Sequence, residues 1–190
     1  MHNFIWQYES ENSDVYDKIY QNAKLLIKNT KSIFTLSNSK TVYEVLKRFF
    51  CENQNICVFV SESRPALEGR VLVKKLLTMG MKVTLLTDCQ LAESIAECDV
   101  IFLGADKILR NGDVVNKTGS KNVGIIARHY GKPVFALSST SKFSKQKKFK
   151  HTLHAQEEVW TYKHRNLKIE NNYFEVVPRT LITKIITENV

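Results

Sequence analysis

Short, nearly continuous apolar runs alternate with amphipathic segments along most of this chain, and this alternation limits the possible folds more than any other sequence feature. The apolar runs are residues 32–36, 56–60, 82–87, 99–104 and 133–138. Their β-branched and aromatic composition predicts buried strands. The segments between them, with apolar residues at helical spacing, predict helices at 38–50, 66–79, 91–97 and 119–130. Because strands of this kind must be covered on both faces, we expect an α/β fold: a doubly wound, mostly parallel sheet with helices on both faces.

The two ends of the chain extend this pattern. Residues 14–28 carry apolar side chains on one helical stripe and predict an amphipathic helix. No linker rich in Pro, Gly or Ser interrupts the chain, so we divide it into an N-terminal helical arm (residues 1–30) and one α/β domain (residues 31–190). Residues 105–117 are predicted to form a polar loop.

The pattern lapses after residue 138 and returns near the C-terminus. Residues 173–178 predict a strand, and residues 178–188 predict a helix with Pro178 in its first turn and an apolar stripe along one side. We expect this segment to return to the sheet and complete it.

Composition excludes several classes of protein. With 190 residues and 43% hydrophobic residues, the chain has the size of one globular domain with a core. It holds no run of 18 apolar residues, and its first residues are acidic and polar. We therefore expect neither a membrane span nor a signal peptide, and a cytoplasmic location.

The sequence offers no metal or cofactor motif. Its four cysteines form no CxxC pair and have no zinc-ligand spacing, so we expect small core or half-buried residues. His151 and His154 lie in a lysine-rich stretch without a neighbouring carboxylate and are expected at the surface. Neither GxGxxG nor a P-loop is present. We expect neither a metal ion nor another cofactor.

An excess of positive charge favours an anionic partner. The formal net charge is +9, and five of the lysines lie in residues 141–150. This stretch is either a solvated loop or a contact surface. Because no motif of a nucleic-acid-binding fold accompanies it, sequence-specific nucleic-acid binding is not supported.

Polar segments follow the predicted strands, where the carboxyl ends of a parallel sheet gather ligands. These segments are 37–39, 61–65, 104–106 leading to 111–113, and 116–119. Hydroxyls, amides, one Arg, one Lys and helix N-termini can together hold a phosphate. Each segment on its own also fits a helix cap or a turn. The candidate binding residues are Asn38, Ser39, Arg64, Asn116, Lys117 and Gly119, and Asp106 is a candidate base.

Four stretches resemble a known family in their order and spacing: SESRPALEGR, GADKILRNGDVVNKTGS, SSTSKF and YFEVVPRTLITKIITE. The family comprises the α, β and δ subunits of translation initiation factor 2B, methylthioribose-1-phosphate isomerase and ribose-1,5-bisphosphate isomerase. The resemblance covers roughly residues 31–190. It implies a Rossmann-like domain and a homodimer.

The resemblance also implies roles for single residues. In the isomerases of this family, a cysteine after the first strand and the Asp of the GAD motif form the catalytic pair. Ser37 stands where that cysteine would be, and Asp106 matches the Asp. Asn116 and Lys117 match the Asn-Lys that contacts the substrate, and Arg64 matches an arginine near the ligand.

Two departures from the family weaken the expectation of catalysis. A serine hydroxyl is a much weaker acid than a thiol, and Ser37 has no neighbouring histidine in its motif. Full family members also carry an N-terminal helical domain with an Arg-Gly-Ala segment that helps hold the substrate phosphate. About 30 residues precede the first predicted strand here, so we expect that part of the phosphate contacts to be missing unless a partner chain supplies it.

Three hypotheses follow. The first is a protein that binds a phosphorylated sugar or nucleotide and has a regulatory or assembly role. The second is an active aldose–ketose isomerase of sugar phosphates that uses Asp106 with a water or Ser37. The third is an interaction protein that binds no small ligand and contacts an acidic protein or RNA.

Overall fold

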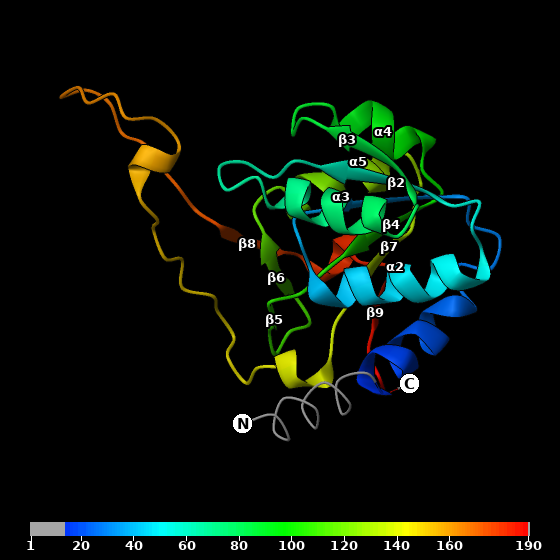
Figure 1. Ribbon diagram of the computed structural model, residues 1–190. Helices are drawn as coiled ribbons and strands as arrows, with labels where there is room; N and C mark the ends of the chain where they lie inside the picture. The colour runs from blue at the N-terminus through cyan, green and yellow to red at the C-terminus, as the bar shows by residue number, and fades with distance from the viewer. Residues whose placement is uncertain (1–13, 190) are drawn as a thin grey trace, which may run out of the picture.

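A six-stranded sheet with strand order β3-β2-β1-β4-β7-β9 forms the centre of the molecule (Figure 1). The computed structural model describes residues 14–189. The strands are β1 (Ser32–Leu36), β2 (Cys57–Ser61), β3 (Lys82–Leu86), β4 (Val100–Leu103), β7 (Val134–Leu137) and β9 (Lys184–Ile186). All neighbouring pairs are parallel. The predicted doubly wound, parallel α/β fold is therefore confirmed.

Helices cover both faces of this sheet. They are α2 (Lys40–Glu52), α3 (Glu68–Thr78), α4 (Leu91–Glu97) and α5 (Ser120–His129). One core cluster joins the apolar faces of α2 and α3 to the sheet, and a second joins α4 and α5 to the opposite face. Strands β1, β4 and β7 lie between these two layers, which explains why their sequences are apolar almost throughout.

The N-terminal helical segment, residues 14–24, packs on the same face as α2. Ile19, Tyr20 and Ala23 are buried in the core cluster that contains the inner side of α2. Leu26 belongs to the predicted apolar stripe but lies beyond the helical residues and is 44% exposed.

The strand order reverses at β1, and that reversal determines where a crevice opens. From β1 the chain winds outward to β2 and β3, then crosses back to β4 on the other side of β1. The loops that leave β1 and β4 therefore diverge at the carboxyl edge of the sheet. In open parallel sheets this is where ligands bind.

A second, antiparallel sheet covers one side of this crevice. The sequence pattern predicts a loop in part of this region. It contains β5 (Lys107–Ile108), β6 (Val114–Lys117) and β8 (Phe174–Val177). The predicted polar loop at residues 105–117 is thus wrong, because it contains two strands joined by a turn at Asn111–Gly112, where Leu109 N–H donates to Asp113 O at 2.8 Å. Strands of two and four residues are too short to show a clear alternation.

The C-terminal segment is the second correction. Residues 178–188 do not form the predicted helix but a single 3₁₀ turn, η3 (Arg179–Leu181), followed by strand β9. This segment is rich in β-branched Ile and Thr, and β7 offers a free edge that β9 pairs with from Phe135↔Lys184 to Leu137↔Ile186. Tertiary pairing outweighs the helical spacing of its apolar residues. The sheet is nevertheless completed from this end, as expected.

Between β7 and β8 the chain leaves the domain as an extended excursion, residues 144–172 (Figure 1, yellow to orange). We call this excursion the arm; it is distinct from the N-terminal helical arm predicted for residues 1–30. It begins after the 3₁₀ turn η1 (Thr140–Lys142) and contains one further turn, η2 (Gln156–Glu158). Most of its side chains are exposed, including the lysines at 145, 147, 148 and 150.

The cysteines only partly match their predicted environments. Cys98 is buried and Cys57 is half-buried, but Cys51 and Cys89 are exposed. The expectation of core or half-buried cysteines is therefore wrong for two of the four. Among residues 14–189, no helix combines the length and apolar composition needed to span a bilayer.

Candidate functional site

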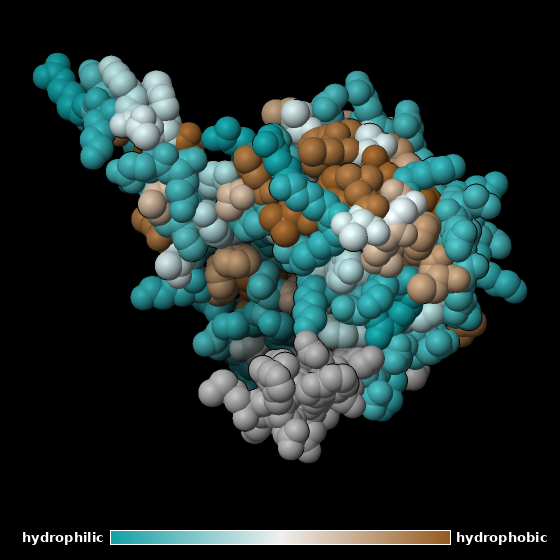
Figure 2. All heavy atoms as spheres, in the orientation of Figure 1, coloured by the Kyte–Doolittle hydropathy of each residue, from teal (hydrophilic) through white to brown (hydrophobic). Residues whose placement is uncertain are grey.

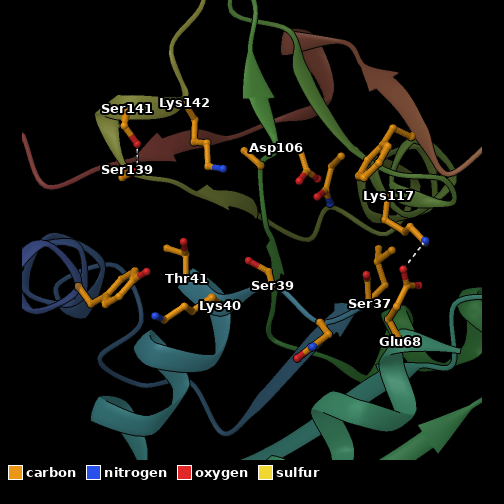
Figure 3. A pocket seen from close by; sticks show the side chains of 16 residues that line it. Ser37, Ser39, Lys40, Thr41, Glu68, Asp106, Lys117, Ser139, Ser141 and Lys142 are labelled. Atoms are coloured by element: carbon orange, nitrogen blue, oxygen red, sulfur yellow. Dashed lines mark hydrogen bonds and ion pairs between the residues drawn. The ribbon is translucent and has the colours of Figure 1, made fainter. Parts of the chain in front are cut away.

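A cavity of about 470 Å³ opens at the carboxyl ends of β1 and β4 (Figure 3). Polar side chains from the main sheet, the small sheet and the turn η1 line it. They are Ser37, Asn38, Ser39, Lys40, Thr41, Glu68, Asp106, Asn116, Lys117, Ser139, Ser141 and Lys142, together with Tyr16, Leu36, Ala105 and Phe174. The cavity thus lies at the reversal of strand order.

The loop after β1 presents the N-terminus of α2 to the cavity. Ser39 is the N-cap residue, and its hydroxyl accepts from Val42 N–H at 3.4 Å. Lys40 and Thr41 in the first turn also line the cavity. No acidic residue occupies that turn, so unsatisfied N–H groups and a lysine together favour an anion here.

The conformation of this loop depends on a buried serine of the neighbouring strand connection. Ser37 has φ of +62°, in the left-handed region, and its N–H donates to Ser63 Oγ at 2.8 Å. Ser63 is itself held by Asp88, whose Oδ1 accepts from Ser63 N–H at 2.8 Å. Asp88 also accepts from Ser61 Oγ and from Arg64 N–H. The polar residues after β2 therefore support the loop that carries Ser37.

Asp106 lies in the middle of the cavity wall. Its N–H donates to Val115 O at 2.9 Å, which fixes the chain after β4 against β6. The side chain reaches solvent through the open cavity, but the surrounding walls desolvate it and raise the pKa of the carboxyl. The ammonium groups of Lys142 and Lys117 act in the opposite direction, and Glu68 adds to the rise.

Lys117 and Asn116 extend from β6, the central strand of the small sheet. Lys117 is 3% exposed, and its Nζ lies 2.5 Å from Glu68 Oε1 at the start of α3. The second oxygen of Glu68 is buried and has no hydrogen-bond partner among the described residues. Asn116 Nδ2 donates to Ser120 Oγ at 2.9 Å, which joins the strand to α5.

The turn η1 supplies the third group of cavity residues. Its position is set from the C-terminal end of the chain, because Thr140 N–H donates to both carboxylate oxygens of Glu188, at 3.0 and 2.9 Å. Ser139 and Ser141 lie with their hydroxyls 2.6 Å apart, and Lys142 points toward the cavity near Asp106 (Figure 3).

The structure brings six of the eight predicted site residues to this cavity: Ser37, Asn38, Ser39, Asp106, Asn116 and Lys117. Arg64 and Gly119 line a neighbouring cavity of about 170 Å³ instead. The Arg64 guanidinium donates to Val159 O at 3.5 Å. The N–H of Gly119, at the start of α5, is satisfied by Glu175 Oε1 at 2.7 Å.

Several cavity residues were not predicted from the sequence. Lys40 and Thr41 directly follow a predicted segment, and Ser139, Ser141 and Lys142 follow the predicted strand at 133–138. The rule that polar residues after a strand line the crevice would have found these. Within residues 14–189, no group of three or more His, Cys, Asp or Glu side chains is placed to hold a metal ion.

Comparison with known proteins finds one matching family and several relatives. The model of the initiation factor 2 subunit family matches residues 2–189. The ribose 1,5-bisphosphate isomerase of Methanocaldococcus jannaschii is 33% identical over 168 residues, which cover 85% of this chain and 54% of that protein. The methylthioribose-1-phosphate isomerase of Bacillus pumilus is 30% identical over 202 residues, covering 96% and 57%. The chain thus spans about half the length of these curated relatives.

A solved structure shows the same fold. The crystal structure of translation initiation factor eIF-2B from Pyrococcus horikoshii superposes with a TM-score of 0.82 at 25% identity, covering 96% of this chain and 66% of that one. The fold described above is therefore also the fold of this initiation factor.

Proposed function

Because the chain belongs to the initiation factor 2 subunit family, we propose that it binds a phosphorylated sugar or nucleotide in the cavity at the strand carboxyl ends and has a regulatory or assembly role. The observation that carries this proposal is the convergence of Lys40, Lys117 and Lys142 on one cavity at the N-terminus of α2. The relatives named as isomerases act on sugar phosphates by name, which fits the chemistry of these lysines.

The distribution of charge favours a ligand with more than one polar end. Figure 3 shows Lys117 with Glu68 at one side of the cavity and Lys40 with Lys142 at the other, and Asp106 between them. Ammonium groups at two ends suit anionic groups at two ends of a ligand, and a central carboxylate suits sugar hydroxyls. A ribose bisphosphate or a nucleotide has this pattern.

Ser37 supports binding without turnover. In the isomerase mechanism that the resemblance implies, this position carries a thiol that exchanges a proton near neutral pH. The Ser37 hydroxyl is a far weaker acid, and its left-handed backbone is held by Ser63 rather than by a base. On this proposal, the chain keeps the scaffold and a charged cavity while Asp106 lacks the acid–base partner that the resemblance implies.

A thermal-shift screen tests the proposal. The purified chain is heated with ribose 1,5-bisphosphate, methylthioribose 1-phosphate, ribose 5-phosphate, AMP, GDP or GTP, and with ribose and adenosine as controls without phosphate. A ligand at 100 times its Kd adds about 2.7 kcal/mol to the free energy of unfolding. We expect at least one phosphorylated compound to raise Tm, the controls to have no effect, and Lys142→Ala to abolish the shift. Failure of every compound rejects the proposal.

An active isomerase is the second candidate, and the raised pKa of the Asp106 carboxyl favours it. A carboxyl whose pKa is moved toward neutrality is better suited to proton exchange with a sugar. This candidate predicts turnover of the compound that binds, loss of turnover in Asp106→Asn, and retained binding in that variant. Binding with no detectable turnover decides for the first candidate.

We propose in addition that two copies of the chain associate. Family members pair through this domain, as the resemblance implies, and Figure 2 shows apolar atoms gathered over α3 and β3. Val71, Leu77 and Leu85 on these elements are 46%, 55% and 43% exposed. Light scattering after size-exclusion chromatography should give twice the mass of 21.9 kDa, and Leu85→Glu should reduce it to one chain. A monomeric wild type rejects this part.

A further inference from the structure

The ammonium of Lys117 lies over an aromatic ring behind the cavity wall. Its Nζ is 3.9 Å from the centroid of the Tyr173 ring, well within the range of a cation–π contact. Because Lys117 is 3% exposed, little water screens this attraction. Tyr173 is not among the residues that line the cavity, but Lys117 is, so Lys117 offers a direct route from the ring to a ligand.

The Tyr173 ring is itself held in place from two directions. Its hydroxyl donates to Glu158 Oε2 at 2.6 Å, and this bond raises the pKa of Tyr173 to about 12, so the phenol keeps its proton at neutral pH. The ring of His154 stacks on it with a centroid distance of 3.7 Å and an interplanar angle of 13°. Since His154 and Lys117 both lie within 4 Å of one centroid, they occupy opposite faces of the ring.

His154 and Glu158 belong to the arm, residues 144–172, so this part of the arm is connected to Lys117 through the Tyr173 ring. In the same part of the arm, His154 N–H donates to Asn171 O at 3.0 Å. Asn171 Nδ2 donates to Ala155 O at 2.7 Å and to Glu158 Oε2 at 2.8 Å. These bonds join the two limbs of the arm beside Tyr173.

The ring and Glu68 have different consequences for an anionic ligand. Glu68 attracts the ammonium of Lys117 with a full negative charge, which also repels a phosphate. The ring attracts the same ammonium through its quadrupole and carries no formal charge. A ring behind Lys117 therefore holds the ammonium at the cavity wall without cancelling its field.

Resting on the proposed function, we propose that Tyr173 is a positioning residue for Lys117, and that its ring thereby raises the affinity of the cavity for phosphorylated ligands. The sequence gives no direct sign of this role, because Tyr173 is separated from Lys117 by the whole arm.

The first experiment needs no ligand. Protein labelled with ¹³C at lysine Cε is compared by NMR with Tyr173→Phe and Tyr173→Leu, and Lys117→Arg identifies the Lys117 signal. The ring current of Tyr173 should shift the Lys117 Hε protons upfield. Tyr173→Phe should keep the shift and Tyr173→Leu should lose it. A Lys117 signal at the same position in all three proteins overturns the positioning role.

The second experiment measures Kd for ribose 1,5-bisphosphate by calorimetry on the full chain. Both variants lose the hydrogen bond to Glu158, so the difference between them reports on the ring alone. We expect Tyr173→Leu to weaken binding about tenfold and Tyr173→Phe to stay within about twofold of the wild type. In a Lys117→Ala background, Tyr173→Leu should have no further effect.

The outcomes separate this inference from the proposed function. Equal affinities of Tyr173→Leu and the wild type overturn the inference while the binding function stands. A further loss in the Lys117→Ala background also overturns it, because Tyr173 would then act by another route. A wild type that binds no phosphorylated probe overturns the binding function and, with it, the effect on affinity. The ligand-free NMR shift then still reports whether the Tyr173 ring lies against Lys117.

Discussion

A β-carbon added to Gly104 would lie 2.5 Å from the Oγ and 2.6 Å from the Cβ of Ser39. The end of β4 and the N-cap of α2 thus touch with no room for a methyl group between them. Ser39 lines the cavity, so this contact lies beside the point where the loops after β1 and β4 diverge.

Gly104→Ala tests this contact. Overpacking against the N-cap residue should destabilise the fold by about 1–3 kcal/mol, measured by urea denaturation. Ser39→Gly alone should cost only a few tenths of a kcal/mol, about the usual difference for an N-cap. The double variant Ser39→Gly/Gly104→Ala should recover most of the loss. A double variant as unstable as Gly104→Ala would show that the strain lies elsewhere.

Lys117→Met should destabilise the fold because it leaves the carboxylate of Glu68 without its partner. Glu68 is 30% exposed and Lys117 only 4% by side chain, so water relieves part of the cost and we expect about 1–3 kcal/mol. Removing both charges in Lys117→Met/Glu68→Leu should restore much of the stability. Chemical denaturation of the wild type, both single variants and the double variant gives the coupling, and additive effects would mean that the pair contributes nothing.

Asp106→Asn should stabilise the fold at neutral pH. Since the pKa of the Asp106 carboxyl is raised in the folded state, the folded protein binds this proton more tightly than the unfolded chain does, and stability is lost as pH rises through the raised pKa. The variant should therefore have a higher Tm than the wild type at pH 7. The difference should vanish below the ordinary pKa of an aspartic acid.

A control separates this effect from a general loss of charge. Glu93 in α4 is exposed, and Glu93→Gln should leave the pH dependence of Tm unchanged. A lower Tm of Asp106→Asn at pH 7 would mean that attraction to Lys142 and Lys117 outweighs the desolvation of the carboxylate.

Glu188→Ala should release the turn η1 from the end of the chain. Both carboxylate oxygens of Glu188 accept from Thr140 N–H, so the variant leaves that donor unpaired at a cost of about 1–3 kcal/mol. Because η1 carries Lys142, affinity for a phosphorylated ligand should fall as well. Lys184→Ala, an exposed change on the nearby strand β9, should alter neither. Unchanged affinity in Glu188→Ala would show that η1 keeps its position without this anchor.

The sequence predicts the main sheet well because strands buried on both faces are apolar throughout, as β4 and β7 are. It also predicts much of the cavity, because residues that follow parallel strands share one edge of the sheet. Strand β9 escapes prediction, since Leu181, Ile182, Ile185 and Ile186 fit a helical stripe and only the free edge of β7 decides otherwise.

The sequence also does not predict the direction of single side chains or the pairing of residues that are distant in the chain. Arg64 follows β2 at the same edge as the cavity, yet its side chain is directed toward Val159 in the arm. Glu68 contacts Lys117 across 49 positions of sequence, and no local pattern marks that pair. Such contacts depend on how the layers pack and not on the period of either segment.

The anchoring of η1 by Glu188 has a consequence for when the cavity is completed during synthesis of the chain. The cavity wall includes residues from Tyr16 onward, but the turn that carries Lys142 gains its anchor only when Glu188 is present. During synthesis the polypeptide emerges from its N-terminus, and domains fold as units once their segments are available. A nascent chain that lacks Glu188 therefore has no anchor for the turn that carries Lys142, and the wall of the cavity is complete only once this residue has been added.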